Sequence, residues 1–326
     1  MRVAMTLVVR DEVDLVGDWL RYHLARGIDQ VIVTDHRSVD GTSEVLAEHA
    51  RDGRVRVIRE EAPEMRQAEW VTRMARLAAT DHGADWVINS DADEFWWPRD
   101  GGVHELLDAI PGRYGVVRGL WRQFVLRPDG PTSFAERMTV RCRPVADFAS
   151  PYHAQVKIAH RALPDVFVSE GNHDAYGDGL TLIREWLPFE VLHFPLRAEA
   201  QVEDKFLRRR AILGGDHIAD AIRRLDSQGL STYHRAVLFD DVEVERGVGD
   251  GTLVVDARLR DALASLEAAT MLPSWTPTLA DDLDLALDFQ LALERDSWVN
   301  LDLRAATLER SIARLESAAT LVGVGT

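Results

Sequence analysis

The sequence predicts an α/β fold in which a mixed sheet is flanked by helices and followed by a C-terminal helical extension. Two observations support the sheet. Strand-like and helix-like segments alternate over roughly the first ninety residues, which is typical of a parallel sheet. From about residue 100 to 195 the segments become short and lie between Pro and Gly turns, which indicates a mixed sheet region. The pattern after about residue 255 is helical.

Each element has a local signature. The apolar run from Val3 to Val9 predicts a strand, and the segment from Leu15 to Arg26 places apolar side chains near the helical period of 3.6 residues. Asp and Thr in segment 38–42 suit a turn and a helix cap. The further predicted elements are strand 31–33, a helix ending at Arg51, strand 55–58, helix 65–80, strands 86–89, 114–118, 138–142 and 166–168, and helix 199–210.

Composition limits the function. The chain of 326 residues has a formal net charge of -16, which argues against a general nucleic-acid binder because such proteins need a basic face. Cys142 is the only cysteine, so an internal disulfide and a cysteine-based zinc site are excluded. No run approaches the ~20 apolar residues that span a bilayer. We therefore expect a cytoplasmic protein, with peripheral attachment to the inner face of the membrane as the alternative.

Three acidic residues directly follow the strand predicted at 86–89. Asp91, Asp93 and Glu94 would stand at the carboxyl end of this strand, where open α/β sheets bind their ligands. So many carboxylates in one place favour a bound cation, and hard oxygen ligands suit Mg²⁺ or Mn²⁺. A solvated turn is the alternative for an isolated Asp-x-Asp. The preceding strand and the two strand-loop units upstream favour the metal site.

Two earlier strands also end in polar loops, Arg10-Asp11-Glu12 and the segment from Asp35 to Thr42. With Asp91-Ala92-Asp93-Glu94-Phe95 and the tract 191–197, these motifs make residues 1–215 resemble the family-2-like glycosyltransferases of the GT-A fold. The likeness is greatest to the subgroup with a Lys-Asn-Glu-like first loop, Asp-x-x-Ser-x-Asp-Gly-Thr in the second loop, and Asp-x-Asp-Glu-Phe. Arg10-Asp11 departs from the Lys-Asn of that subgroup, whereas Glu12 matches it.

The resemblance implies a domain plan and a set of ligand contacts. Residues 1–215 would form the catalytic domain, with 1–100 as the nucleotide-binding half and 101–215 as the acceptor-side half, and 216–326 would be a mainly helical region. Asp91, Asp93 and His193 would hold Mn²⁺ or Mg²⁺ against the diphosphate. The nucleotide-sugar contacts would come from Arg10, Glu12, Asp35, Asp91, Lys157 and Lys205.

The implied reaction moves a sugar from a nucleotide-sugar, most often a UDP-sugar, to a hydroxyl of a glycan or small-molecule acceptor, in glycan or surface polysaccharide biosynthesis. Inversion at the sugar needs a base on the face opposite the diphosphate. The polar segment 169–174 follows an apolar strand and offers Asp174 as the favoured base, with Glu170 second. A polar loop without chemistry is the alternative for this segment.

Three further alternatives follow from the sequence. A phosphohydrolase of the haloacid dehalogenase type also uses Asp-x-Asp after a strand and would need Lys157 and Asp240-Asp241 in the same site. A non-catalytic scaffold would bind a sugar nucleotide or glycan without turnover. Leu301, Leu308, Leu315 and Val322 recur at seven residues, so the last helix either packs on the catalytic domain or forms a homodimer.

Overall fold

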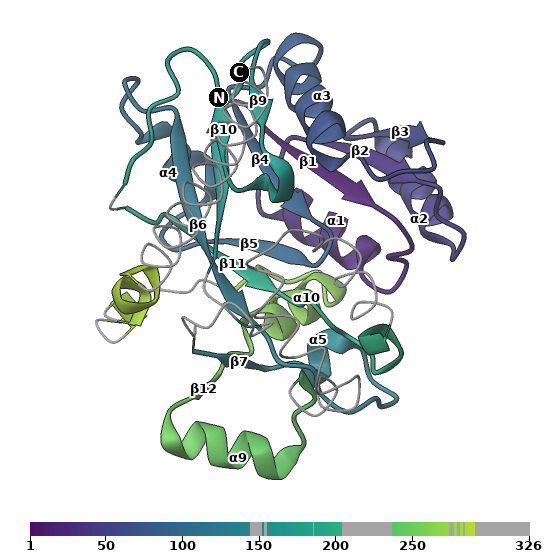
Figure 1. The fold of residues 1–326 in the computed structure, drawn as a ribbon, viewed down its shortest axis with the longest axis vertical. Helices are drawn as coiled ribbons and strands as arrows, with labels where there is room; N and C mark the ends of the chain where they lie inside the picture. The colour runs from purple at the N-terminus through teal and green to yellow at the C-terminus, as the bar shows by residue number, and fades with distance from the viewer. Residues whose placement is uncertain are drawn as a thin grey trace, which may run out of the picture.

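The computed structural model describes residues 1–143, 152, 155–184, 186–203, 237–273, 277–278, 281–282 and 284–290. Within them lies an eight-stranded mixed sheet of order β3-β2-β1-β4-β8-β6-β11-β5. This confirms the predicted α/β class, with helices on both faces of the sheet (Figure 1). The strands of this sheet are β1 (Val3–Val9), β2 (Gln30–His36), β3 (Val55–Glu60), β4 (Trp86–Asp91), β5 (Glu94–Pro98), β6 (Val116–Gln123), β8 (Val156–Arg161) and β11 (Phe189–His193).

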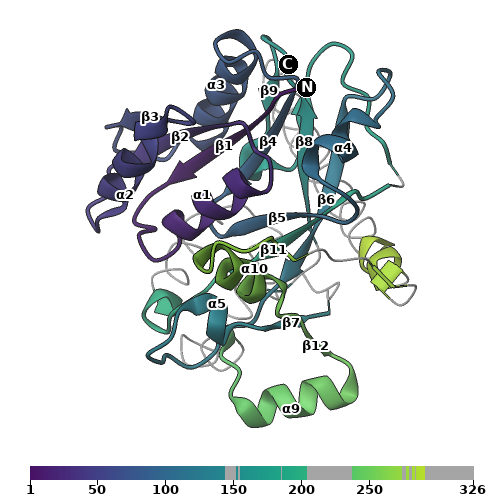
Figure 2. The same ribbon diagram turned by 180° about the vertical axis from the view of Figure 1, so that it is seen from behind.

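The described residues also form two small sheets and several helices. The small sheets pair β9 (Phe167–Val168) with β10 (Ala175–Tyr176), and β7 (Val140–Cys142) with β12 (Leu253–Val255). The helices are α1 (Val16–Ala25), α2 (Thr42–His49), α3 (Gln67–Thr80), α4 (Val103–Asp108), α5 (Phe134–Arg137), α9 (Asp241–Asp250) and α10 (Arg258–Glu267), with 3-10 turns η1 (Ala50–Asp52) and η2 (Glu170–Asn172). Figures 1 and 2 place α9 at the end of the molecule opposite α3.

The N-terminal half is a parallel sheet covered on both faces. β1 lies between β2 and β4 and is parallel to both. Its alternate side chains divide between two cores, because successive residues of a strand point to opposite faces. Met5 and Leu7 pack with α1 and α2, whereas Ala4 packs with α3. The apolar β1 sequence is therefore buried from both sides, as parallel sheets require.

The second half of the sheet is mixed. β8 is antiparallel to both β4 and β6, and β6 is parallel to β11. β5 forms the last strand and is antiparallel to β11. Sequence patterns assigned no element to residues 94–98, so β5 is a finding of the structure. It matters for the site because it begins at Glu94.

Helix α1 covers the outer edge of β5. The Trp19 Nε1–H group donates to the Glu94 carbonyl at 2.8 Å, and the Tyr22 hydroxyl donates to the Trp96 carbonyl at 3.2 Å. The Trp96 N–H group donates to His23 Nε2 at 3.1 Å. An edge strand leaves backbone groups unpaired, and here side chains of a helix satisfy them. The strand that carries Glu94 is thereby held in place from its open side.

Some predictions fall outside the described residues or are not tested. The heptad pattern at 301–322 and Lys205 lie outside the described residues, as does the predicted helix 199–210 beyond residue 203. The domain boundaries remain a prediction. Among the described residues, no helix has both the length and the apolar character needed to cross a bilayer.

Candidate functional site at the carboxyl edge of the sheet

The polar loops predicted from the sequence lie next to one another. Val9 of β1 pairs with Asp35 of β2, and Val8 pairs with Asp91 of β4. Because the three strands are parallel, their carboxyl ends meet at the same edge of the sheet. Arg10 and Glu12 follow β1 at this edge.

The first loop is held by a buried arginine. The Arg197 guanidinium forms ion pairs with Glu12 and with Asp14, the latter at 2.7 Å. The Glu12 N–H group donates to Thr42 Oγ1 at 2.9 Å, which ties the first loop to the start of α2. Arg10 is more exposed and lies 3.7 Å from the Asp11 carboxylate. Glu12 therefore has a fixed position, whereas Arg10 faces solvent.

Asp35 is buried at the end of β2. Its carboxylate accepts hydrogen bonds from the Ser38 N–H group at 3.2 Å and from the Ser43 hydroxyl at 2.5 Å. The exposed Arg59 guanidinium lies 3.5 Å from the same carboxylate. These contacts fix the second loop and position Asp35 at the edge that Glu12 and Asp91 share.

The acidic cluster consists of Asp91, Asp93 and Glu94, and Asp91 has three donors. Its Oδ1 atom accepts from Gln67 Nε2 at 2.7 Å and from Asn172 Nδ2 at 3.1 Å. Its Oδ2 atom accepts from the Lys157 ammonium at 2.6 Å. Asp91 is therefore bound within the protein on both carboxylate oxygens.

Lys157 and Glu94 form the buried centre of the cluster. The Lys157 ammonium lies 2.8 Å from Glu94 Oε1, which also accepts from Trp121 Nε1 at 2.9 Å. Burial raises the pKa of Glu94 to about 8; Lys157 opposes this shift, and the Asp91 and Asp93 carboxylates add to it. Burial disfavours the charged form of Lys157, but the Asp91 and Glu94 carboxylates outweigh burial and raise its pKa. Lys157 thus faces two carboxyl groups, and the raised pKa of Glu94 means that the charged form of this residue needs a further nearby cation at neutral pH.

Asp93, Glu94 and His193 are positioned to share a metal ion. One ligand atom from each lies within 4.8 Å of the others. His193 Nδ1 lies 2.5 Å from Gln123 Oε1, so the hydrogen bond at this nitrogen directs Nε2 toward the Asp93 carboxylate, 3.4 Å away. The ring of His193 stacks on Trp121 at 4.0 Å between centroids. A carboxylate-imidazole set held in this way suits Mn²⁺ or Mg²⁺.

The expected metal set and this group differ in one residue. The sequence predicted Asp91, Asp93 and His193, whereas the structure groups Glu94 with Asp93 and His193. Asp91 ends β4, and Glu94 begins β5 and faces His193 across the strand pair. Sequence spacing gave no sign of that strand pair, because it joins residues about one hundred positions apart.

The segment 169–174 reaches the acidic cluster through Asn172. Asn172 is buried and adopts a left-handed backbone with φ 61°, and it directs its amide to Asp91. The candidate bases lie on either side of it and are exposed. Glu170 Oε2 accepts from the Ala68 N–H group at 3.2 Å, and the Asp174 N–H group donates to Ser169 Oγ at 2.9 Å. The loop that carries the predicted bases therefore lies at the edge of the site.

Sequence reasoning assigned no role to Gln67, Asn172 or Gln123, and it considered Trp121 only as a candidate stacking face for a sugar. Their side chains are neutral, and none belongs to a recognisable motif. Trp121 and Gln123 stand on one face of β6 at alternate positions, so the strand places both beside His193. The contacts of Gln67 and Asn172 with Asp91 depend on how α3 and the segment 169–174 pack against β4.

These features define an α/β fold with a mixed central sheet and a candidate divalent-cation site at its carboxyl edge. Residues 20–126 match the family described as glycosyl transferase family 2. The matched segment runs from α1 into the residues after β6 and contains the acidic cluster. A comparison with curated proteins gave no match.

Several solved structures are similar at low identity. Glucosyl-3-phosphoglycerate synthase from Mycobacterium tuberculosis, in complex with Mn²⁺, uridine diphosphate and phosphoglyceric acid, is 20% identical over 37% of this chain and 43% of that chain, with a TM-score of 0.28. A mycobacterial protein is 23% identical over 40% and 42% of the two chains, with a TM-score of 0.27. The chain thus spans about two fifths of these structures. S. aureus TarS 1-349 in complex with UDP-GlcNAc is 12% identical over 91% and 92%, with a TM-score of 0.37. At such scores no ligand or residue role is transferred.

Proposed function

We propose that the protein is a metal-dependent, inverting glycosyltransferase that moves a sugar from a nucleotide-sugar, a UDP-sugar, to a hydroxyl acceptor in glycan or surface polysaccharide biosynthesis. The observation that carries the proposal is the grouping of Asp93, Glu94 and His193 at the carboxyl edge of a sheet that lies partly in a family-2 glycosyltransferase segment. When bound there, Mn²⁺ or Mg²⁺ would stabilise the charge of the departing diphosphate.

The loops at this edge supply the nucleoside contacts of the proposal. Glu12 and Asp35 are carboxylates at the ends of neighbouring parallel strands, and carboxylates accept strong hydrogen bonds from ribose hydroxyls and base N–H groups. Arg10 adds an exposed cation nearby. The burial of Lys157 favours a role in holding Asp91 and Glu94 over direct contact with a diphosphate. We include in the proposal the contact between Lys205 and the phosphates that the sequence predicts.

Asp174 is the proposed base, with Glu170 as the alternative. Both belong to the exposed loop that Asn172 joins to Asp91. The Glu170 carboxylate accepts a hydrogen bond from the Ala68 N–H group in the first turn of α3. Loss of transfer in Asp174→Asn, with transfer kept in Glu170→Gln, would support this assignment. The reverse pattern would assign the base to Glu170.

The phosphohydrolase alternative needs Asp240 and Asp241 beside Asp91. Asp240 instead caps α9, accepting from the Glu243 N–H group at 2.8 Å, and Asp241 forms an ion pair with Arg127. In Figure 1, α9 lies far from β4, which weighs against this reading. A non-catalytic scaffold would bind the same nucleotide-sugar as the proposed enzyme but would not release its sugar, so only an activity assay separates the two.

The test is a thermal-shift panel of UDP, GDP, dTDP and CMP, each with and without Mn²⁺, followed by assay of sugar release. A ligand at a hundred times its Kd stabilises a protein by about 2.7 kcal/mol, which gives a clear shift. We expect a manganese-dependent shift with UDP that disappears in Asp93→Asn and persists in Asp178→Asn, a control in the exposed loop after β10. Nucleotide binding without sugar release would indicate the scaffold. No shift with any nucleotide would overturn the proposed function.

A further inference from the structure

Gln67 connects two parts of the site that come from distant segments. Its Nε2–H group donates to Asp91 Oδ1 at 2.7 Å, and its Oε1 atom accepts from the Gly171 N–H group at 3.2 Å. A glutamine amide offers a donor and an acceptor on one planar group. The Asp91 carboxylate can only accept a hydrogen bond and the Gly171 N–H group can only donate one. A single orientation of the Gln67 amide therefore satisfies both partners.

The loop 169–174, which Gln67 contacts, has an unusual backbone conformation at two consecutive residues. Gly171 and Asn172 are consecutive residues with positive φ angles of 74° and 61°. A side chain at Gly171 would place its Cβ atom 2.6 Å from the His173 ring. A left-handed conformation of a residue other than glycine costs about 1 kcal/mol or more and persists only where its surroundings fix it. The contacts of Gln67 and Asn172 with Asp91 provide that support.

The N-terminus of α3 anchors the same loop at a second point. The Ala68 N–H group, in the first turn of α3, donates to Glu170 Oε2 at 3.2 Å. Glu170, Gly171 and Asn172 are thus each bonded to α3 or to Asp91. The position of the loop 169–174 relative to the acidic cluster therefore depends on where α3 begins.

We propose that Gln67 is a positioning residue that sets the loop 169–174, which carries the proposed base, at a fixed distance from the acidic cluster. This assignment rests on the proposed function. Gln67 acts on the reaction through its contacts with Asp91 and Gly171 and not through contact with the donor or the acceptor. Removing it leaves the metal group of Asp93, Glu94 and His193 intact, so donor binding and transfer should respond differently.

The test uses Gln67→Met, which keeps the length of the side chain and removes both hydrogen bonds. The matched control is Glu69→Gln, an exposed position in the same turn of α3. We expect the kcat for transfer to fall by about tenfold to a hundredfold in Gln67→Met, as hydrogen bonds to a charged group suggest. The KM for the donor and the Mn²⁺-dependent UDP shift should stay at the wild-type values. Amide hydrogen exchange at residues 170–174 should become faster than in Glu69→Gln.

A second variant separates the two contacts. Gln67→Glu keeps an acceptor for the Gly171 N–H group but places a carboxylate against Asp91. Exchange at Gly171 should stay near the wild-type rate while transfer falls, and this variant also serves if Gln67→Met does not fold. Transfer and exchange equal to those of Glu69→Gln in both variants would overturn the positioning role. A wild-type protein with neither UDP binding nor transfer would instead overturn the proposed function, and this assignment with it.

Discussion

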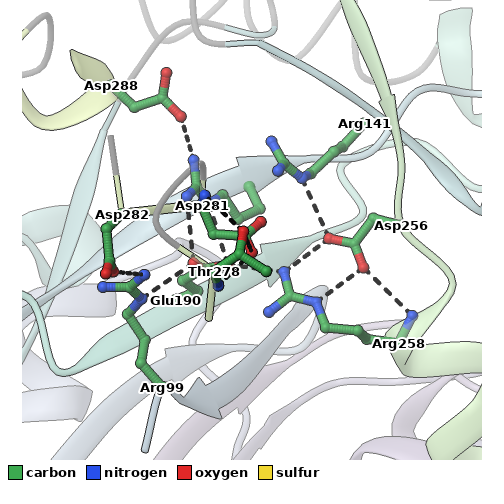
Figure 3. A network of polar contacts seen from close by, with 10 residues as sticks. Arg99, Arg141, Glu190, Asp256, Arg258, Thr278, Asp281, Asp282 and Asp288 are labelled. Carbon is green, nitrogen blue, oxygen red and sulfur yellow. Dashed lines mark hydrogen bonds and ion pairs between the residues drawn. The ribbon is translucent and has the colours of Figure 1, made fainter. Parts of the chain in front are cut away.

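Neutralising Glu190 should destabilise the protein strongly, because three arginines meet at this buried carboxylate (Figure 3). The distances to its oxygens are 3.3 Å from Arg99 Nε, 3.2 Å from Arg122 Nε and 2.7 Å from Arg258. Removing one partner of a buried ion pair costs about 3–5 kcal/mol. Asp288, Asp256 and Asp282 stay paired with these arginines, so we place the loss for Glu190→Gln near the lower limit, about 3 kcal/mol.

The effect should also depend on pH. Burial favours the neutral carboxyl, but Arg122 and Arg258 outweigh it and hold the pKa of Glu190 well below its usual range. The folded pKa is thus below the unfolded value of about 4.3, so the contribution of the carboxylate is complete above that pH and declines as pH falls. The difference in unfolding free energy between wild type and Glu190→Gln should be constant from pH 7 to 5 and should narrow by about 1.4 kcal/mol per pH unit below about 4.3.

Urea unfolding at pH 7, 5 and 3.5 measures this difference. Glu267→Gln, at the exposed end of α10, is the control and should lie within about 0.5 kcal/mol of wild type. A loss below about 1 kcal/mol for Glu190→Gln at pH 7 would refute the assignment of the network as a stabilising one. A difference that widens in acid would refute the sign of the linkage.

Three further predictions follow from buried groups. Burial lowers the pKa of His23 to about 3, so wild-type stability should fall by about 1.4 kcal/mol per pH unit from this group below pH 6.5, and His23→Gln should reduce that slope in urea unfolding. Lys157→Met leaves Asp91 and Glu94 without their ammonium partner, so its unfolding free energy at pH 7 should fall by about 3–5 kcal/mol, measured in the same way. Burial raises the pKa of Cys142 to about 12, so a chromogenic thiol reagent at pH 8 should modify it only after urea is added.

The parallel half of the fold could be predicted because its signals are local. The apolar run 3–9 coincides with β1, and the strand ends carry the polar loops in the expected positions. β5 could not be predicted in this way, because its edge is completed by α1 side chains some seventy residues earlier, such as Trp19 bonded to the Glu94 carbonyl. Its sequence also contains Pro98 at the end and no alternating pattern.

The site could be predicted in part for the same reason. Asp91 ends β4 and Asp93 lies two residues beyond it, so their positions depend mainly on neighbouring residues. Gln67 and Asn172 lie 24 and 81 positions from Asp91, and no pattern in the chain links them. Polar contacts of this kind depend on the packing of whole elements, which the sequence specifies only through the complete fold.

Strand β6 contributes to two charged groups, the arginine network around Glu190 and the acidic cluster, and these groups differ in how far their positive and negative charges cancel. Arg122 and Gln123 are neighbours on β6, and their side chains point to opposite faces. Arg122 reaches Glu190 in a network in which arginines and carboxylates pair with one another, whereas Gln123 reaches His193 beside the acidic cluster. The network therefore needs no further ion. In the acidic cluster, Lys157 alone pairs with both Asp91 and Glu94, and the raised pKa of Glu94 shows that its charged form is disfavoured there. A divalent cation would stabilise that charged form. Metal binding at the proposed site should therefore raise the unfolding free energy of the protein as well as support the transfer reaction.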